Sequence, residues 1–129
     1  MLEQFRLDGR RVVVTGSSRG LGLAAAQLLA KAGAELVLAA RDGGELEKVA
    51  AEIVDQTGSS AIAAQLDVTN SAEVEGVFEG IYRQGKIDVL VNCAGIEHQH
   101  PLEEFPDSDW DEVLATNLTG RSRLQFHTA

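Results

Sequence analysis

Short apolar runs alternate along the chain with longer segments in which apolar residues recur at helical spacing. The runs expected to form strands cover residues 11–15, 36–40, 61–66 and 87–91. The segments expected to form amphipathic helices carry their apolar positions at residues 21–32, 46–54, 74–81 and 110–118. Strands that are apolar throughout, and that alternate with helices, form parallel sheets covered on both faces. The pattern therefore predicts an α/β fold with an open, doubly wound parallel sheet of the Rossmann-like type, in which the strand order 3-2-1-4 is expected by analogy.

Helix boundaries are marked by residues with known capping preferences. The apolar face of the first helix is expected at Leu21, Ala24, Ala25, Leu28, Leu29 and Ala32. Gly33 is expected to end this helix as a C-terminal glycine cap. Asn70 and Glu73 form a capping pair that predicts the start of the third helix, and acids from Asp107 to Asp109 predict the start of the last one.

The composition is that of a folded domain with an acidic surface. The chain has 129 residues, one Cys and a net charge of -9, with 11 Lys and Arg against 20 Asp and Glu. A surface this acidic repels the phosphates of nucleic acids and anionic lipids, so neither nucleic acid nor membrane is an expected partner. A single Cys excludes an internal disulfide framework and suits a reducing compartment. With no apolar run of about 18 residues and no secretory leader, we expect a cytoplasmic protein.

A glycine-rich segment directly follows the first expected strand. It reads Thr15-Gly16-Ser17-Ser18-Arg19-Gly20-Leu21-Gly22. Glycine is required where a backbone turns sharply or approaches a ligand, and the helix that follows presents unpaired N–H groups to a pyrophosphate. A merely tight turn between strand and helix is the alternative, but this position in the chain favours a phosphate cradle. The residues predicted to bind a cofactor here are Gly16, Ser18, Arg19, Gly20, Leu21 and Gly22.

Residues that could take part in binding or catalysis also follow the other expected strands. They are Arg41 after the second strand, Asp67 and Val68 after the third, and Asn92, Ala94 and Gly95 after the fourth. The carboxyl ends of parallel strands meet at the edge of the sheet where open α/β folds bind ligands. We therefore expect these residues and the glycine segment to surround one dinucleotide.

Arg41 bears on the choice between the two nicotinamide dinucleotides. An acidic residue at the end of the second strand suits the 2′-hydroxyl of NAD, whereas an arginine there suits the 2′-phosphate of NADP. Arg19 adds a second cation, so the sequence favours NADP. Asp42 keeps NAD open, and an ordinary solvated side chain is the alternative interpretation of Arg41.

Two of these motifs together resemble those of a known family. The pattern Thr-Gly-x3-Gly-x-Gly is matched by the glycine segment, and an Asn-Ala-Gly type motif by residues 92–95. Residues 5–120 thus resemble the N-terminal part of the short-chain dehydrogenase/reductase family. The resemblance implies an NAD(P)-dependent oxidoreductase that transfers hydride between nicotinamide and a small-molecule carbonyl or secondary alcohol, with Asp67 and Val68 against the adenine. A looser likeness to gluconate 5-dehydrogenase and related sugar-acid dehydrogenases rests on residues 5–10 and 104–110.

Asn117 and two histidines are the remaining candidates for direct chemistry. Asn117 lies on the apolar stripe that begins at Trp110 and should point towards the sheet, where a polar side chain needs hydrogen-bond partners. The resemblance implies that it is the Asn of the family's Asn-Ser-Tyr-Lys catalytic set. A structural Asn satisfied by backbone groups is the alternative, and both can hold. His98 and His100 lack the further ligands that a transition metal needs, so we expect no metal and favour contact with substrate.

The rest of that catalytic set is not found where the family has it. The resemblance implies that the Tyr-x3-Lys pattern lies beyond a fifth strand, and the sequence ends at Ala129 before one could form. The Ser of the set is also absent. Tyr82 and Lys86 have the right interval, but they precede the fourth strand. Tyr82 continues an apolar helical face and is expected to be a core or boundary residue. The enzymatic activity of the chain itself therefore stays open. The alternative is a non-catalytic nucleotide-binding or subunit-interaction protein from a truncated reading frame.

The expected organisation is an incomplete NAD(P)-binding domain over residues 1–120, truncated after about four strands, followed by an atypical tail over 121–129. The tail has two Arg and no acid, as a shifted reading frame or a premature end would give. Missing strands would leave the fourth strand as an edge and Trp110, Leu114 and Leu118 uncovered. Aggregation or pairing with another chain, such as a homo-oligomer, is then expected.

Overall fold

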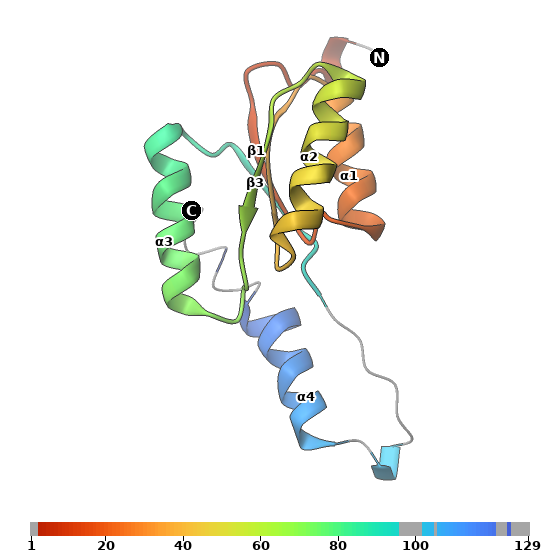
Figure 1. Ribbon diagram of the computed structural model, residues 1–129, viewed down its shortest axis with the longest axis vertical. Helices are drawn as coiled ribbons and strands as arrows, with labels where there is room; N and C mark the ends of the chain where they lie inside the picture. The colour runs from red at the N-terminus through yellow and green to blue at the C-terminus, as the bar shows by residue number, and fades with distance from the viewer. Residues whose placement is uncertain (1–2, 96–101, 105, 121–123, 125–129) are drawn as a thin grey trace.

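The computed structural model describes residues 3–95, 102–104, 106–120 and 124, which form alternating strands and helices. The strands are β1 (Arg11–Thr15), β2 (Glu35–Ala40), β3 (Ala61–Gln65) and β4 (Val89–Asn92). The helices are α1 (Gly20–Lys31), α2 (Gly43–Thr57), α3 (Ser71–Gln84) and α4 (Asp107–Leu114), with the short η1 (Glu3–Phe5) and η2 (Leu102–Glu104) and the π-helical η3 (Ala115–Gly120). Figure 1 shows α1 and α2 on one face of the sheet and α3 on the other, with α4 beyond one end of the strands.

The strands are parallel and lie in the order β3-β2-β1-β4. Val13 of β1 is in register with Val37 of β2 on one side and with Leu90 of β4 on the other. β1 is buried throughout and β2 over most of its length, because helices cover both faces of the sheet. The predicted doubly wound parallel sheet and its 3-2-1-4 order are confirmed.

β4 begins later than predicted, at Val89 rather than Ile87. Asp88 is the reason, because its Oδ2 accepts a hydrogen bond from the N–H of Arg11 at 2.8 Å while its own N–H donates to the Arg11 carbonyl at 2.9 Å. The carboxylate of Asp88 thus takes the place of a backbone carbonyl as acceptor where the pairing of β1 with β4 begins. The buried guanidinium of Arg11 also donates to the Ile81 carbonyl at 2.6 Å, which fastens the end of α3 to β1.

Alternate residues of the central strands build one hydrophobic core on each face of the sheet. Val12 and Val14 pack with α1 and α2, whereas Val13 packs with α3. Phe78 of α3 is among the largest fully buried side chains and lies in the second core. Leu124 is also fully buried there, so this residue of the predicted tail packs with the domain. The boundary at residue 120 stays a prediction.

The predicted inner face of α1 is wrong in part: Ala32 is buried and Leu29 packs against the core as expected, but other positions are not. Leu21 and Leu28 are 86% and 61% exposed, whereas Gly22, Ala26 and Ala30 are buried. These three small residues recur at every fourth position and so share one side of the helix. The helix presents them to the sheet because small side chains allow the closest approach. Leu21 and Leu28 are among the most apolar residues of the predicted face, but they do not lie on the side of α1 that packs against the sheet.

The predicted ends of three helices are confirmed. Gly33 follows α1 with a left-handed φ of 97°. At the start of α3, Asn70 Oδ1 accepts a hydrogen bond from the N–H of Glu73 at 3.1 Å. Asp107 and Asp109 lie in the first turn of α4, where their charge is favourable to the helix dipole.

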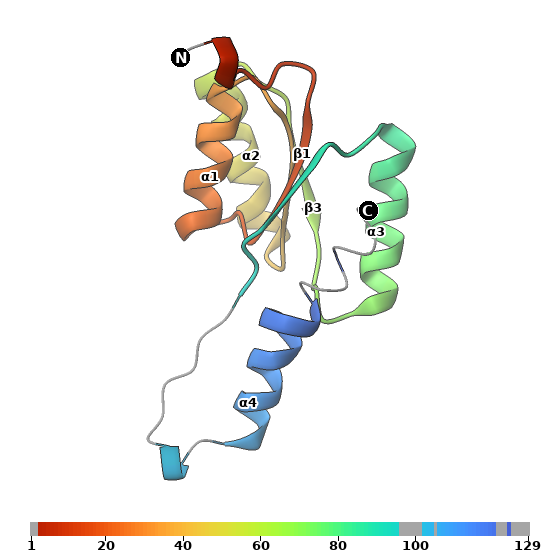
Figure 2. The same cartoon turned by 180° about the vertical axis from the view of Figure 1, so that it is seen from behind.

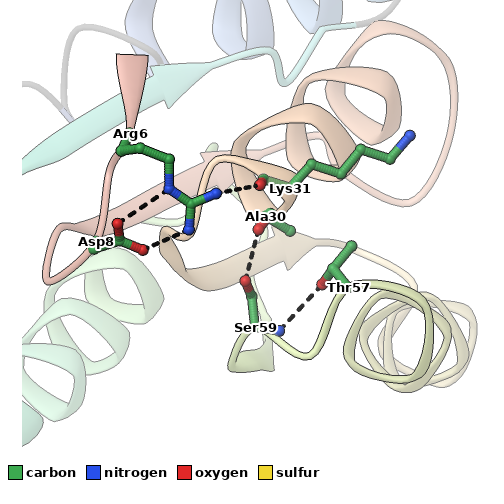
Figure 3. Close-up of polar contacts among 6 residues, drawn as sticks. All are labelled: Arg6, Asp8, Ala30, Lys31, Thr57 and Ser59. Carbon is green, nitrogen blue, oxygen red and sulfur yellow. Dashed lines mark hydrogen bonds and ion pairs between the residues drawn. The ribbon is translucent and has the colours of Figure 1, made fainter. Parts of the chain in front are cut away.

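Side chains from two other segments hold the last turn of α1 (Figure 3). Arg6 donates to both carboxylate oxygens of Asp8 and, at 3.2 Å, to the carbonyl of Lys31. Ser59, in the turn between α2 and β3, donates to the carbonyl of Ala30 at 2.6 Å. The last carbonyls of a helix have no partner within it, so these donors satisfy them and attach both segments to α1.

The apolar side of α4 and η3 is open to solvent. Trp110, Leu114 and Leu118 are 59%, 40% and 64% exposed, as expected for an uncovered face. Figure 2 shows α4 extending away from the layer formed by the strands, rather than lying across it.

In the described part of the chain, no helix is long and apolar enough to cross a membrane. Nor do any three His, Cys, Asp or Glu residues of that part form a metal-binding group. His98 and His100 lie outside the described residues.

Candidate functional site

A cavity of about 440 Å³ opens at the carboxyl-terminal edge of the sheet. In Figure 1 this is the edge towards α4, to which the β3 arrow points. The predicted cofactor residues that line the cavity are Gly16, Ser18, Arg19, Leu21, Gly22, Arg41, Asp67, Val68, Ala94 and Gly95. Residues that follow all four strands therefore share one cavity, as the topology requires for a ligand site at a sheet edge.

Three predicted residues do not line this cavity. Gly20, the first residue of α1, is exposed and has a φ of 62°. Asn92 is half-buried, and its Oδ1 accepts a hydrogen bond from the hydroxyl of Thr15 at 3.2 Å, which is a contact within the protein. Asn117 is half-buried, while its neighbour Thr116 lines the cavity. The roles of Gly20, Asn92 and Asn117 in binding or catalysis stay predictions.

The glycines of the loop between β1 and α1 have different tasks. At Gly16, φ is 65° and an added Cβ would lie 2.7 Å from the carbonyl oxygen of Cys93. At Gly22, an added Cβ would overlap the carbonyl of Gly16. At Gly20, nothing lies within 4 Å of an added Cβ. The loop thus has one glycine for the turn, one for the packing of α1 and one beside open space, as pyrophosphate-binding loops require.

The N-terminus of α1 differs from those of α2 and α3. The side chains of Asp42 and Asn70 cap α2 and α3 by accepting hydrogen bonds from the N–H groups of Glu45 and Glu73, both at 3.1 Å. Arg19 precedes α1 in an extended conformation and gives no side-chain cap. The first turn of α1 lines the cavity. Its N–H groups and the positive end of the helix dipole are therefore of the kind that suits an anion.

Thr15 joins the end of β1 to the loop after β4. Its buried Oγ1 accepts hydrogen bonds from the N–H groups of Cys93 and Ala94, each at 3.1 Å, and donates to Asn92 Oδ1 at 3.2 Å. A hydroxyl has one donor and two acceptor positions, so all of them are used. The bonds hold two parts of the cavity wall side by side.

The end of β2 places charged side chains on the cavity wall. Arg41 is exposed, and its backbone carbonyl accepts a hydrogen bond from Gln65 Nε2 at 3.0 Å. Arg19 of the glycine loop is a second exposed cation on the same cavity. Asp42 and Glu45 also line it, but Asp42 is engaged in capping α2. The two guanidinium groups are thus the groups on this wall that suit an anion.

Asp67 is held as an ionised acceptor after β3. Its Oδ1 accepts hydrogen bonds from the hydroxyl of Thr69 at 2.6 Å and from the Thr69 N–H at 2.9 Å. The hydroxyl bond is the main cause that lowers the pKa of Asp67; partial burial opposes it, and the Thr69 N–H and the Arg41 charge add to it. The Asp67 N–H donates to the carboxylate of Glu73 at 3.1 Å. The first turn of α3 therefore also positions the site.

Thr116 reaches the cavity because the chain after α4 is π-helical. A π-helix has wider turns than an α-helix, so the spacing assumed for the apolar stripe from Trp110 does not continue through η3. Thr116 and Gly120 are buried, whereas Leu118 is exposed. A Cβ on Gly120 would lie 3.0 Å from the carbonyl of Val68, so glycine allows η3 to approach the end of β3.

A family model described as short chain dehydrogenase matches residues 10–125. The chain belongs to the short-chain dehydrogenase family. It is 39% identical over 120 residues to the 5-keto-D-gluconate 5-reductase of Escherichia coli K12, which covers 92% of this chain and 47% of the relative. It is 43% identical over 115 residues to the gluconate 5-dehydrogenase of Gluconobacter oxydans, which covers 88% of this chain and 44% of the relative.

A solved structure gives the same result for the fold. The crystal structure of a gluconate 5-dehydrogenase from Burkholderia cenocepacia, in complex with NADP and tartrate, matches with a TM-score of 0.91 at 38% identity. The match covers 98% of this chain and 49% of that one. The chain thus spans about half the length of the relatives it matches. The predicted family and the likeness to gluconate 5-dehydrogenases are confirmed.

Sequence reasoning missed part of this short-chain dehydrogenase site. Thr15, Cys93 and Thr116 line the cavity without having been predicted to do so. Thr15 could have been found, because a polar residue that ends an otherwise apolar strand needs a partner. Nothing in the sequence signals the π-helix that turns Thr116 inward. Tyr82 and Lys86 lie near the end of α3 and do not line the cavity, as their position before β4 led us to expect. Tyr82 is exposed, so its expected place in the core or at its boundary is wrong.

Proposed function

We propose that this chain forms the cofactor-binding part of an NADP-preferring oxidoreductase that transfers hydride between nicotinamide and a carbonyl or secondary alcohol. The observation that carries the proposal is one cavity, shared by four strand ends, whose wall holds an uncapped helix N-terminus and two arginines. Membership in the short-chain dehydrogenase family and the likeness to an NADP-bound relative support it.

The residues present fit the phosphates of a dinucleotide. The first turn of α1 offers N–H donors, Ser18 adds a hydroxyl, and the open side of Gly20 leaves room for close approach to the backbone. Arg19 and Arg41 would bind the 2′-phosphate, because a guanidinium offers paired donors to phosphate oxygens. When bound, the nicotinamide supplies or accepts the hydride. The residues of this chain bind and orient the dinucleotide.

The preference for NADP rests on the different roles of Arg41 and Asp42. Recognition of the 2′-hydroxyl of NAD uses a carboxylate near the end of β2. Asp42 is the acid nearest that point in the chain, but its Oδ1 caps α2 through the N–H of Glu45. Withdrawing such a cap costs about 1 kcal/mol. Arg41 is exposed on the cavity and has no comparable structural task for its guanidinium among the described residues.

The proposed substrate is a small hydroxy or keto compound of the sugar-acid type. The support is the likeness to proteins named 5-keto-D-gluconate 5-reductase and gluconate 5-dehydrogenase. Asn117 is the residue of this chain that we propose takes part in catalysis, within the catalytic set of the family. Its backbone lies next to Thr116 on the cavity wall.

A second candidate function is nucleotide binding without turnover by these 129 residues. It is favoured by a specific observation, since no Tyr or Lys is found among the described residues that line the cavity. Proton transfer to or from the substrate oxygen needs such a group within hydrogen-bond reach. Binding and turnover must therefore be measured separately.

The test is a fluorescence titration of the purified chain with NADPH and with NADH, followed by an assay with 5-keto-D-gluconate. We expect NADPH to bind at least about tenfold more tightly, since charged hydrogen bonds contribute about 1.5–3 kcal/mol. Arg41→Ala should remove most of this difference and leave NADH binding nearly unchanged. Arg10→Ala, an exposed arginine away from the cavity, is the matched control.

Equal affinities of the wild type for NADPH and NADH would contradict the NADP preference, and absence of binding would contradict the proposed function. Binding without turnover would favour the second candidate.

We also propose that the exposed apolar face of α4 and η3 pairs with a second copy of the chain in the cytoplasm. The support is the exposure of Trp110, Leu114 and Leu118, which a monomer would leave in water. Leu114→Glu should shift the protein towards a monomer in analytical ultracentrifugation. A wild-type chain that sediments as a monomer at all concentrations would contradict this proposal.

A further inference from the structure

β3 lies at one edge of the sheet and has β2 as its single neighbour among the described strands. The carbonyl of Ser60 accepts a hydrogen bond from the N–H of Leu36 of β2 at 2.9 Å. The pairing with β2 continues in register through Gln65, and in a ladder successive residues turn their backbone groups to opposite sides. Ala61, Ala63 and Gln65 therefore turn their N–H and C=O groups away from the sheet.

This edge lacks the features that usually protect a strand edge from other chains. Residues 59–66 contain no charged residue and no proline, and the register with β2 shows no bulge. In Figure 1 the β3 arrow is in plain view between α2 and α3. In the strand order 3-2-1-4-5-6 of this fold type, further strands add beside β4 and leave β3 at the edge. The edge is thus open to a partner.

Exposed apolar side chains and a hollow adjoin this edge. Ile62 is 39% exposed and lies on the same face as Ala64, which packs with the core beneath α3. A hollow of about 500 Å³ is lined by residues of β3, among them Gln65, and by the start of α2 with Glu47 and the turn before it. Val54 lies two turns after Glu47 on the same side of α2 and is 42% exposed.

The charges around the edge favour a basic partner. α2 carries four acids and one lysine, and the hollow is lined by Asp42 and Glu47 against Arg41. Two copies of the chain that paired along β3 would bring two such helices together, and like charges repel. A strand that carries a basic residue would instead meet opposite charge.

We propose that the free edge of β3 docks an extended peptide segment of another protein, which pairs antiparallel with β3 and places a Lys or Arg beside Glu47 and an apolar residue against Ile62. Hydrogen bonds to the outward groups of Ala61, Ala63 and Gln65 supply affinity, and the two side-chain contacts supply specificity. Antiparallel pairing is slightly the more stable arrangement. Residues opposite each other share a face, so the basic residue stands opposite Gln65 and the apolar one, three residues later, opposite Ile62.

The experiment uses an acetylated pentapeptide, Lys-Thr-Val-Val-Val, with fluorescein at its C-terminus, and follows fluorescence anisotropy as the full chain is added. We expect saturable binding, and binding at least about threefold weaker for the same peptide with Glu in place of Lys, as for an exposed ion pair. Glu47→Lys should reverse this preference. Glu52→Lys is the matched control, because it changes the net charge equally at an exposed position on another side of α2, and it should keep the wild-type preference.

Ala63→Pro tests the role of the backbone. Proline removes an outward N–H and leaves the hydrogen bonds to β2 in place, so peptide binding should fall at least about tenfold while thermal unfolding shows that the fold is retained. If this variant does not fold, the charge reversal at Glu47 decides. A wild-type chain that binds neither peptide, or both equally, would overturn the inference. A wild-type dimer in analytical ultracentrifugation that Ala63→Pro dissociates would also overturn it, because a second copy would then occupy the edge.

Discussion

The hydroxyl of Thr15 accepts a hydrogen bond from the backbone N–H of Ala94 at 3.1 Å, across the junction of β1 and β4. This junction is where the strand order reverses, so chains on its two sides turn away from each other and leave a crevice for a ligand. A bond across it fixes the width of the crevice.

Thr15→Val is expected to destabilise the domain and weaken dinucleotide binding together. Valine has the shape of threonine, but it leaves the N–H groups of Cys93 and Ala94 without their acceptor. A donor that loses its acceptor costs about 1–3 kcal/mol when it is fully buried, and Cys93 and Ala94 are half-buried, so we expect a loss towards the lower end of this range. Urea unfolding should show this loss of free energy of unfolding, and a titration with NADPH should show weaker binding.

Thr15→Ser is the control for that experiment. Serine retains the hydroxyl and removes one methyl group, which is worth about 1 kcal/mol when buried. A serine variant as unstable as the valine variant would mean that packing of the methyl group, and not the hydrogen bonds, holds the two loops together.

Gly22→Ala is expected to prevent correct packing of α1, whereas Gly76→Ala is expected to stabilise the protein. A Cβ at Gly22 would overlap the carbonyl of Gly16, and backbone on both sides cannot yield cheaply. A Cβ on Gly76, within α3, meets nothing within 4 Å. Alanine in the interior of an exposed helix is favoured over glycine by about 1 kcal/mol. Circular dichroism melts of both variants test the contrast, and a folded, fully stable Gly22→Ala protein would contradict the packing role.

Most of the fold was predictable because the relevant rules act locally. The alternation of strands and helices along the sequence predicts a parallel sheet. Gly33 ends α1 through its backbone conformation, and Asn70 begins α3 through its side-chain hydrogen bond. The contacts that failed prediction depend on tertiary structure. α1 turns Ala26 rather than Leu28 to the sheet, because the space beneath the helix is set by its neighbours.

The residues of the candidate site also divide into those that the sequence predicts and those that depend on tertiary structure. Gly16, Arg41 and Asp67 were predictable because they follow strands whose carboxyl ends must meet. Thr116 was not, because a π-helix has no distinctive residue pattern and shifts every later position. The hydrogen bonds of Thr69 to Asp67 were also not predicted, although a Thr two residues after an Asp is a common turn arrangement.

Ser17→Ala is expected to raise the free energy of unfolding. Ser17 is completely buried, and its Oγ has no hydrogen-bond partner among the described residues. An unsatisfied buried hydroxyl costs about 1–3 kcal/mol, so alanine should recover part of this amount. Ser18, which lines the cavity, provides the comparison. Ser18→Ala should weaken NADPH binding with little change in stability. A destabilised Ser17→Ala variant would show that the hydroxyl does have a partner.

Stability below neutral pH should depend on Asp88. The N–H of Arg11 is the main cause that lowers the pKa of Asp88; burial opposes this effect, and the charges of Lys86 and Arg10 add to it. Because the folded pKa is lower than the unfolded value of about 4, the unfolded chain binds more protons in this range. The contribution of Asp88 is therefore complete above about pH 4 and is lost as the pH falls through the folded pKa.

Asp88→Asn should thus flatten the dependence of the free energy of unfolding on pH below about pH 5, measured by urea unfolding at several pH values. The amide can still accept the Arg11 N–H bond that sets the start of β4, so the fold is retained. Asp55→Asn, at an exposed position of α2, is the matched control for the loss of one carboxylate. Added salt should weaken the contributions of Lys86 and Arg10 but not the hydrogen bond from Arg11, since screening acts on exposed charges. If the wild-type slope disappears entirely at high salt, the ion pairs and not the backbone hydrogen bond control the ionisation of Asp88.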